Sequence, residues 1–169
     1  VDLLDNPDGE DYFLQQGNDG TATSLRAEAQ RLLGSMPAEG RNAYEILYGA
    51  RARRMLNEAV ELGDAAKLTE VSRRFFHTQA GYEATLLLGR YHLNRGRPLA
   101  GALALRRIAE TDAAARFEPE LSLVLATCWM YAEQPEPAAQ VLRKLKENQP
   151  SVRVTIAGNA VARFKQEGQ

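Results

Sequence analysis

Apolar residues recur every three or four positions along most of this chain, which is the spacing of one face of an α-helix. Two segments show the pattern most clearly, from Tyr44 to Leu62 and from Leu121 to Ala132. Weaker versions of the pattern predict shorter helices. Together the segments indicate an all-α protein whose helices are joined by tight loops, with the shorter helices at 25–33, 65–76, 99–110 and 135–147.

Prolines and glycines stand where these helices would begin and end. A proline is tolerated in the first helical turn, because the N–H that it lacks has no intrahelical partner there. A glycine after the last apolar position can take the left-handed conformation that ends a helix. Gly63 and Gly96 follow their helices in this way, and prolines open the predicted first turns at Pro37, Pro98, Pro119 and Pro135.

Small residues recur at a fixed spacing in the second part of the chain. Gly101 lies twelve residues after Gly89, and Ala138 lies twelve residues after Ala126, so the second pair repeats the first at an offset of 37. Repeats of this length are typical of stacked helical hairpins. We therefore expect each pair to mark a close helix crossing. Each unit also ends in a similar phrase, Leu105-Arg106-Arg107-Ile108 and Leu142-Arg143-Lys144-Leu145.

An earlier unit fits the same register with one insertion. Counting back 37 residues from Gly89 reaches Ala52, and the phrase Arg73-Arg74-Phe75 matches Arg106-Arg107-Ile108. Ala52 and Arg73 are 21 residues apart, whereas Gly89 and Arg106 are 17 apart. The surplus of four residues is about one helical turn, so it lengthens the hairpin without rotating its inward face. Three consecutive hairpins are predicted, with the 25–33 helix as an N-terminal cap.

The pattern changes after Pro150. Val152, Val154 and Ile156 alternate with polar or small residues, and a similar alternation runs through 160–164. With Gly158-Asn159 as the turn, this pattern favours a β-hairpin. The alternative is one more amphipathic helix that caps the stack. The expected organisation is an acidic flexible arm or linker at 1–22, a helical repeat domain at 23–149, and a C-terminal hairpin or capping segment at 150–169.

Composition is that of one globular domain, with 169 residues of which 44% are hydrophobic and 25% charged. The net charge is −1, so charge alone does not favour nucleic-acid binding. Six acids and no base occur in the first twenty residues, which leaves 16 acids against 21 bases in the rest. We interpret this acidic arm as a linker; the alternative is an arm that docks on the basic body or on a partner.

Two further features bear on context. No run of eighteen apolar residues is present, so we expect no membrane span in this segment. The chain starts at Val1 with no signal-peptide pattern, and we read it as a piece of a longer protein.

The ingredients of a catalytic or metal site are sparse. His77 and His92 are the two histidines, Cys128 is the single cysteine, and no HExxH, CxxC or glycine-rich phosphate loop occurs. A zinc site would have to gather its ligands from three separate helices. We expect His77 at a helix junction, His92 on a packing face, and Cys128 packed as a small hydrophobe. The serines lack a GxSxG context. We predict no enzyme activity, no metal and no cofactor.

The sequence favours a binding surface over a catalytic or metal site, and the repeat indicates which residues would form it. Arg53 and Asn57 lie four apart, hence on one face of a helix, and Arg90 and Asn94 repeat the pair 37 residues later. Arginine can bind a carboxylate, and asparagine can satisfy both the N–H and the C=O of an extended backbone. These chemistries suit a peptide. In the third unit the same positions hold Thr127 and Tyr131; the alternative is that all are ordinary solvated helix positions.

A second basic series ends the last helix of each unit, at Arg73-Arg74, Arg106-Arg107 and Arg143-Lys144. A cation in the last turn of a helix interacts favourably with the helix dipole and stabilises the helix by about 0.3–1 kcal/mol. A phosphate-binding stripe is the alternative, and it would require the three doublets to face one way.

The paired helices resemble tetratricopeptide-type repeats. Gly89 would be the small residue of helix A, the first helix of a hairpin, and Gly101 that of helix B, the second, with Gly96 between them; Ala126 and Ala138 match in the next unit. The runs around 44–56, 74–78 and 87–92 also resemble the N-terminal helical region of large bacterial envelope proteins, notably of planctomycetes, that carry quinoprotein-like β-propeller repeats downstream. This resemblance implies a right-handed solenoid, a periplasmic or envelope location, and an adjoining propeller.

The sequence therefore leaves two alternative predictions of function. In the first, the chain is a non-catalytic protein–protein interaction module that binds a peptide or a neighbouring domain. The resemblance implies that helix A lines the concave face, where the candidate binding residues would be Arg53, Asn57, Arg90, Asn94 and Tyr131. In the second, it is a structural spacer that packs against a downstream β-propeller of the same polypeptide. Neither function needs nucleic acid, and a cytoplasmic location stays open.

Overall fold

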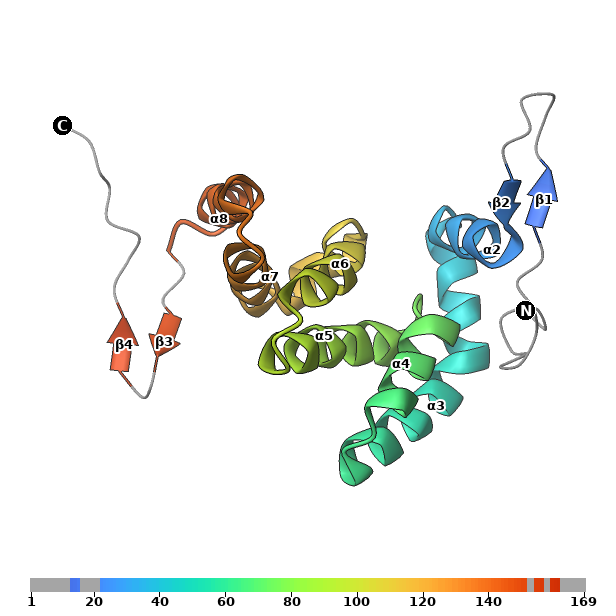
Figure 1. Ribbon diagram of the computed structural model, residues 1–169. Coiled ribbons are helices and arrows are strands. Elements are labelled where there is room, and N and C mark those ends of the chain that lie inside the picture. The colour runs from blue at the N-terminus through green and yellow to red at the C-terminus, as the bar shows by residue number, and fades with distance from the viewer. Residues whose placement is uncertain (1–12, 16–21, 152–153, 157–158, 162–169) are drawn as a thin grey trace. The chain divides into compact units, whose positions relative to one another are not determined.

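The computed structural model describes residues 13–15, 22–151, 154–156 and 159–161, and these residues are mostly helical, which confirms the all-α prediction (Figure 1). Two compact units divide the chain, one ending at Leu88 and the other beginning at Gly89. The helices are α2 (Leu25–Gly34), α3 (Ala38–Leu62), α4 (Ala65–Arg74), α5 (Gln79–Asn94), α6 (Pro98–Ala109), α7 (Glu120–Tyr131) and α8 (Pro135–Asn148), with a 3-10 helix, η1 (Asp112–Phe117).

Three helix-to-helix turns are built in the same way. Each contains one left-handed residue: Gly63 (φ 63°), Gly96 (φ 68°) and, without the freedom of a glycine, Glu133 (φ 59°). The next N–H in each turn donates to the carbonyl five residues earlier, at 2.9 Å in all three cases. This is the hydrogen bond of a Schellman turn. The helix that follows begins one residue later, at Ala65, Pro98 and Pro135, so both predicted glycine stops and two of the prolines are confirmed.

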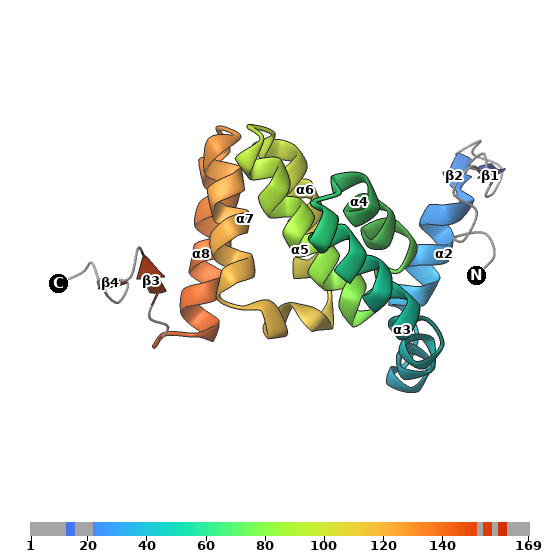
Figure 2. The ribbon, with the colours of Figure 1, turned by 90° about the horizontal axis from the view of Figure 1, so that it is seen from below.

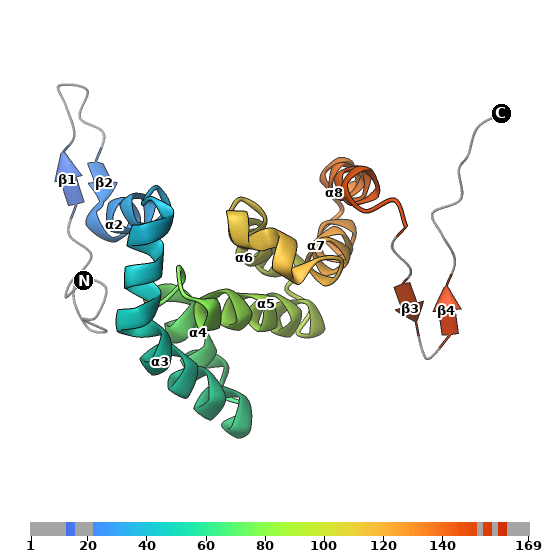
Figure 3. The same cartoon turned by 180° about the vertical axis from the view of Figure 1, so that it is seen from behind.

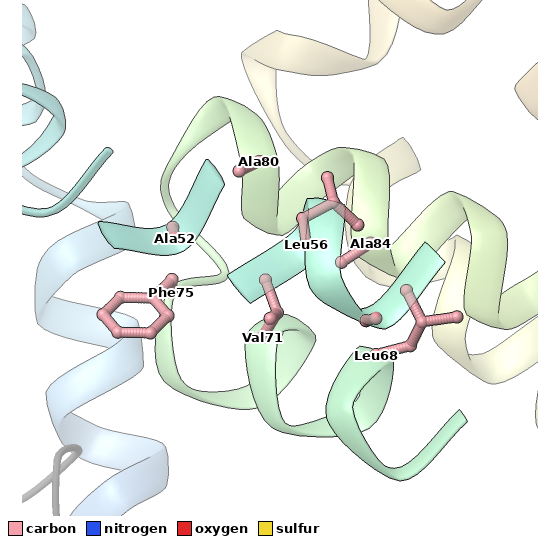
Figure 4. Packing of buried hydrophobic residues seen from close by; sticks show 8 residues of the cluster. Ala52, Leu56, Leu68, Val71, Phe75, Ala80 and Ala84 are labelled. Atoms are coloured by element: carbon pink, nitrogen blue, oxygen red, sulfur yellow. The ribbon is translucent and has the colours of Figure 1, made fainter. Parts of the chain in front are cut away.

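The core of the first unit lies where α3, α4 and the start of α5 meet. Figure 3 shows α4 beside the C-terminal part of α3, and Figure 4 shows the apolar side chains that fill this junction. Ser72 and Thr85, both buried, share a hydrogen bond of 2.7 Å within the same unit. The members of the cluster are Ala52, Leu56, Ala59, Leu68, Val71, Phe75, Ala80 and Ala84.

The inserted turn lies entirely in α3. Ala52 precedes the left-handed Gly63 by eleven residues, whereas Gly89 precedes Gly96 by seven. From the left-handed residue to the arginine doublet the spacing is ten in both units. The four extra residues therefore extend the end of α3, as predicted, and leave Val60 and Leu62 exposed there.

The junction between α4 and α5 is very tight. Thr78 caps α5, because its hydroxyl oxygen accepts the N–H of Gly81 at 3.0 Å. A Cβ on Gly81 would lie 1.8 Å from the carbonyl oxygen of Phe75, a distance at which no side chain fits. His77 sits in this junction, as predicted, and its Nε2 donates to the carbonyl of Gln30 at 3.0 Å, which ties α2 to the rest of the first unit.

The helices of the second unit cross where the small residues predict. A Cβ on Gly101 would lie 2.9 Å from the carbonyl oxygen of Gly89 and 2.9 Å from the sulfur of Cys128. The close approach of Gly89 and Gly101 is thereby confirmed. Ala126 and Ala138 are both buried in the corresponding pair, in which α7 lies beside α8 (Figure 2).

Short strand pairs stand at both ends of the described residues. Near the C-terminus β3 (Val154–Ile156) pairs antiparallel with β4 (Asn159–Val161). Asn159 is paired with Ile156, so the expectation that it forms the turn is wrong. Near the N-terminus β1 (Phe13–Gln15) pairs with β2 (Ala22–Ser24), and β1 lies inside the segment 1–22 that was expected to be a flexible arm. The rest of that arm, Val152 and 162–164 lie outside the described residues.

Candidate interaction surface

We call α3, α5 and α7 the A helices and α4, α6 and α8 the B helices. Arg53 lies near the middle of α3 and pairs with Glu83 on α5, the next A helix. The contact is bidentate: Nη2 donates to Oε1 at 2.7 Å, and Nη1 donates to Oε2. Bidentate arginine–carboxylate pairs fix geometry as well as charge, so the guanidinium of Arg53 is held between two A helices.

Arg90 repeats this arrangement 37 residues later. Its Nη1 donates to Oε1 of Glu120, the first residue of α7, at 2.7 Å. Glu120 itself lies 37 residues after Glu83, so donor and acceptor share the repeat. The repeat predicted the two arginines as site residues but not their glutamate partners. The signal was present, because both acids keep the spacing that singled out Arg53 and Arg90.

The two ion pairs differ in exposure. The hydrogen bonds from Arg53 hold the pKa of the Glu83 carboxyl below its usual value, although burial acts in the opposite direction. The same contact raises the pKa of Arg53. The side chains of Arg90 and Glu120 are both about half exposed. Exposed pairs contribute little to stability, so Arg90 is the more available of the two guanidinium groups for a ligand.

Asn57 and Asn94 lie one turn beyond the arginines, on the exposed side of α3 and α5. Within the part of the chain that the structure describes, neither amide forms a side-chain hydrogen bond. Each therefore presents a free donor and a free acceptor to solvent. Arg53 and Asn57 belong to the first unit, and Arg90, Asn94 and Tyr131 belong to the second.

The third A helix is less charged at these positions, as its sequence predicts. The hydroxyl of Thr127 donates to the carbonyl of Leu123 in its own helix, at 2.8 Å. Tyr131, the last residue of α7, is 72% exposed, and its neighbour Met130 is 57% exposed. This end of α7 offers an aromatic and apolar surface where the other A helices offer arginine and asparagine.

The basic doublets do not behave as one series. Arg73-Arg74 and Arg106-Arg107 lie in the last turns of α4 and α6, as predicted. Arg143-Lys144 lies further from the end of α8, which runs on to Asn148, so that expectation is wrong. Arg73 is exposed, whereas Arg74 is buried against the ring of Phe75 and pairs with Glu70. Because the members of one doublet differ this much, they do not form a common stripe.

The side chains of His92 and Cys128 both lie within 4 Å of the Cβ position of Gly101. Among the described residues no group of three histidine, cysteine or acidic side chains is placed to hold a metal ion. Desolvation lowers the pKa of His92, and the positive charge of Arg97 adds to the effect. Cys128 is fully buried, and burial raises the pKa of its thiol to about 11. It packs against Gly101, the role expected of a small apolar residue.

Searches against known proteins return no match. No protein-family model, no curated protein and no solved structure matches this chain. Among the described helices, none combines the length and the apolar character that a membrane crossing requires.

Proposed function

We propose that this chain is a non-catalytic protein-interaction module built as a tetratricopeptide-like stack of α-hairpins. Its ligand is a peptide or a neighbouring domain that contacts the A helices. The observation that carries the proposal occurs once in each unit: Asn57 and Asn94 occupy equivalent positions, both are exposed, and both amides are free of hydrogen bonds to described residues. A periplasmic or envelope location belongs to the same proposal and is supported by the sequence resemblance alone.

The arginines support this surface in a different way from the one first expected. Each is held by a glutamate from the next A helix, so it positions the helix face on which the asparagine lies. The asparagine amide then supplies both a donor and an acceptor to a peptide backbone. A ligand carboxylate that reaches Arg90 would have to share it with Glu120.

Capture experiments with asparagine variants test the proposal. The tagged wild-type chain should retain a partner from an extract of the source cells, and the Asn57→Ala/Asn94→Ala variant should lose it. Asn42→Ala is the matched control, because Asn42 is an exposed asparagine on the same helix α3, ten residues before the small residue Ala52. Arg53→Ala/Arg90→Ala should also lose the partner while circular dichroism keeps its helical signal. Equal capture by all four proteins would contradict the proposal.

A second function is favoured by the composition of α6. From Pro98 to Leu105 this helix contains no polar residue, and Leu99 and Leu103 are exposed. The equivalent positions in α8 are Glu136 and Gln140. A helix that is apolar all round is usually covered, so α6 is the surface on which a spacer would pack against a downstream β-propeller domain.

The spacer function has its own test in the full-length polypeptide. Replacing Leu99 and Leu103 by glutamine should raise the proteolytic sensitivity of the junction with the following domain and leave peptide capture unchanged. Unchanged proteolysis would count against α6 as the packing surface. Loss of capture with unchanged proteolysis would instead favour a ligand on the B helices.

A further inference from the structure

The contacts between successive A helices follow one register, counted from the small residue of each helix (Ala52, Gly89 and Ala126). The position one residue later holds Arg53, Arg90 and then Thr127. The position six residues earlier holds Ile46, then Glu83 and Glu120. Inside the chain, the later position of one A helix meets the earlier position of the next, as the two arginine–glutamate pairs show.

Apolar residues in the same register are buried at these internal junctions. Leu56, four residues after Ala52, shares a buried cluster with Ala84, which lies five residues before Gly89 (Figure 4). Leu121 occupies the position of Ala84 in α7 and is also fully buried. The junction of α3 and α5 therefore combines one ion pair with one apolar contact.

The first and last A helices, α3 and α7, each expose the residues that form one side of such a junction. On α3, Ile46 and Leu47 stand at the positions of Glu83 and Ala84, and they are 81% and 70% exposed. On α7, Met130 stands at the position of the buried Leu56 and is 57% exposed. Thr127, at the position of the arginines, is exposed as well.

We propose that these two exposed surfaces bind each other in different copies of the chain, so that α7 of one copy packs against α3 of the next. Met130 then contacts Leu47, and Thr127 contacts Ile46. The contact continues the register of the internal junctions from one copy to another. It goes beyond the proposed function, because it requires no peptide and uses neither Asn57 nor Asn94.

The chemistry of the two surfaces favours a second copy as the occupant. Among the described residues α3 has no A helix before it, and it carries Ile46 where the other A helices carry a glutamate. Likewise α7 has no A helix after it, and it carries Thr127 where the other A helices carry an arginine. A buried charge without a partner would be costly, and a junction between copies leaves none at these positions. A partner that carried the repeat's glutamate would meet Thr127 instead of an arginine.

The contact is heterologous, because two different surfaces of the chain meet. Such contacts extend from copy to copy unless a rotation closes a ring. Sedimentation of the full chain should therefore show an average mass that rises with concentration from about 10 µM to about 1 mM, the range of weak interfaces. A mass of one copy at every concentration would overturn the proposal.

A matched pair of variants locates the contact. Leu47→Glu should weaken association at least about tenfold, because it buries a carboxylate against Met130. Leu62→Glu is the control, since Leu62 lies on the same helix with the same exposed fraction of 70% but outside the surface. Both positions are exposed, so both variants should unfold at the temperature of the wild type. Equal association by the two variants would also overturn the proposal.

Restoring the ion pair of the internal junctions gives a gain-of-function test. Ile46→Glu alone and Thr127→Arg alone should each weaken association. When the two single variants are mixed, the introduced guanidinium of one can meet the introduced carboxylate of the other, so association should return and become sensitive to salt. A mixture that associates no better than its components would show that α3 and α7 do not meet in this register.

Discussion

At the scale of the residue, one carbonyl oxygen decides what position 81 can hold. Gly81 lies in α5, where an alanine would ordinarily favour the helix by about 1 kcal/mol. Its missing Cβ makes room for the carbonyl of Phe75, which would lie only 1.8 Å from that atom. The helical periodicity of the sequence does not reveal this contact.

Gly81→Ala should therefore destabilise the chain, against the trend of helix propensity. The backbone at the junction of α4 and α5 would have to move, and we expect a loss of about 3 kcal/mol or more in the free energy of unfolding. Urea titration followed by circular dichroism measures it. An unchanged or more stable variant would show that the junction is looser than described.

Glu133 is the residue at which one turn departs from the other two. It takes the left-handed conformation, φ 59°, that Gly63 and Gly96 take without a Cβ. Glu133→Gly should stabilise the chain by about 0.5–1 kcal/mol, because relief of the left-handed strain exceeds the added freedom of the unfolded chain. Gly96→Ala should cost about 1 kcal/mol at the equivalent position. Thermal unfolding of the two variants should shift in opposite directions.

At the scale of the element, the sequence predicts the bounds of helices well, but it predicts poorly which segments and side chains pair with each other. The predicted helices at 99–110 and 135–147 match α6 and α8 within a residue at each end, because proline and the left-handed residue act locally. The pairing of β1 with β2 and the exact turn of β3 and β4 depend on register between segments, which periodicity leaves open. The glutamates of the arginine pairs keep the 37-residue spacing, but spacing alone does not say which side chains meet.

The pair of Arg53 and Glu83 should make the attachment of α3 to α5 depend on pH. The pKa of Glu83 is lowered in the folded chain, so its contribution is present above the pKa of the unfolded carboxyl, about 4.3, and is lost as the pH falls through the folded value. Glu83→Gln should thus cost at most about 1 kcal/mol at pH 7, and the difference from wild type should vanish in acid.

Urea unfolding at a series of pH values checks this expectation. Glu120→Gln removes the equivalent acid from the more exposed pair and should change stability less. A deficit for Glu83→Gln that persists at low pH would mean that packing, not charge, is lost.

At the scale of the whole molecule, the spacing of small residues was the most informative signal. It predicts the close approach of Gly89 and Gly101, because a crossing this tight excludes larger side chains. The identity of a ligand leaves no comparable trace, since exposed positions such as Asn57 and Asn94 are not constrained by packing. Fold class therefore follows from the sequence, whereas the glutamate partners of Arg53 and Arg90 are identified by the contacts in the structure.

Cys128 offers a readout of the unfolding of the second unit. Its thiol is fully buried, and burial raises its pKa to about 11, so the folded protein should react very slowly with thiol reagents at pH 8. Adding urea should raise the labelling rate in parallel with the loss of helical signal. Fast labelling in the absence of urea would show that the packing around Gly101 opens locally.

The shared Schellman turn means that the polypeptide can be lengthened by duplication. Residues 98–134 begin at a proline in a first helical turn and end one residue after a left-handed position. A second copy of this stretch, inserted after Gln134, would start and finish with the backbone angles already present at both joins. The chain thus carries its own template for an additional 37-residue module.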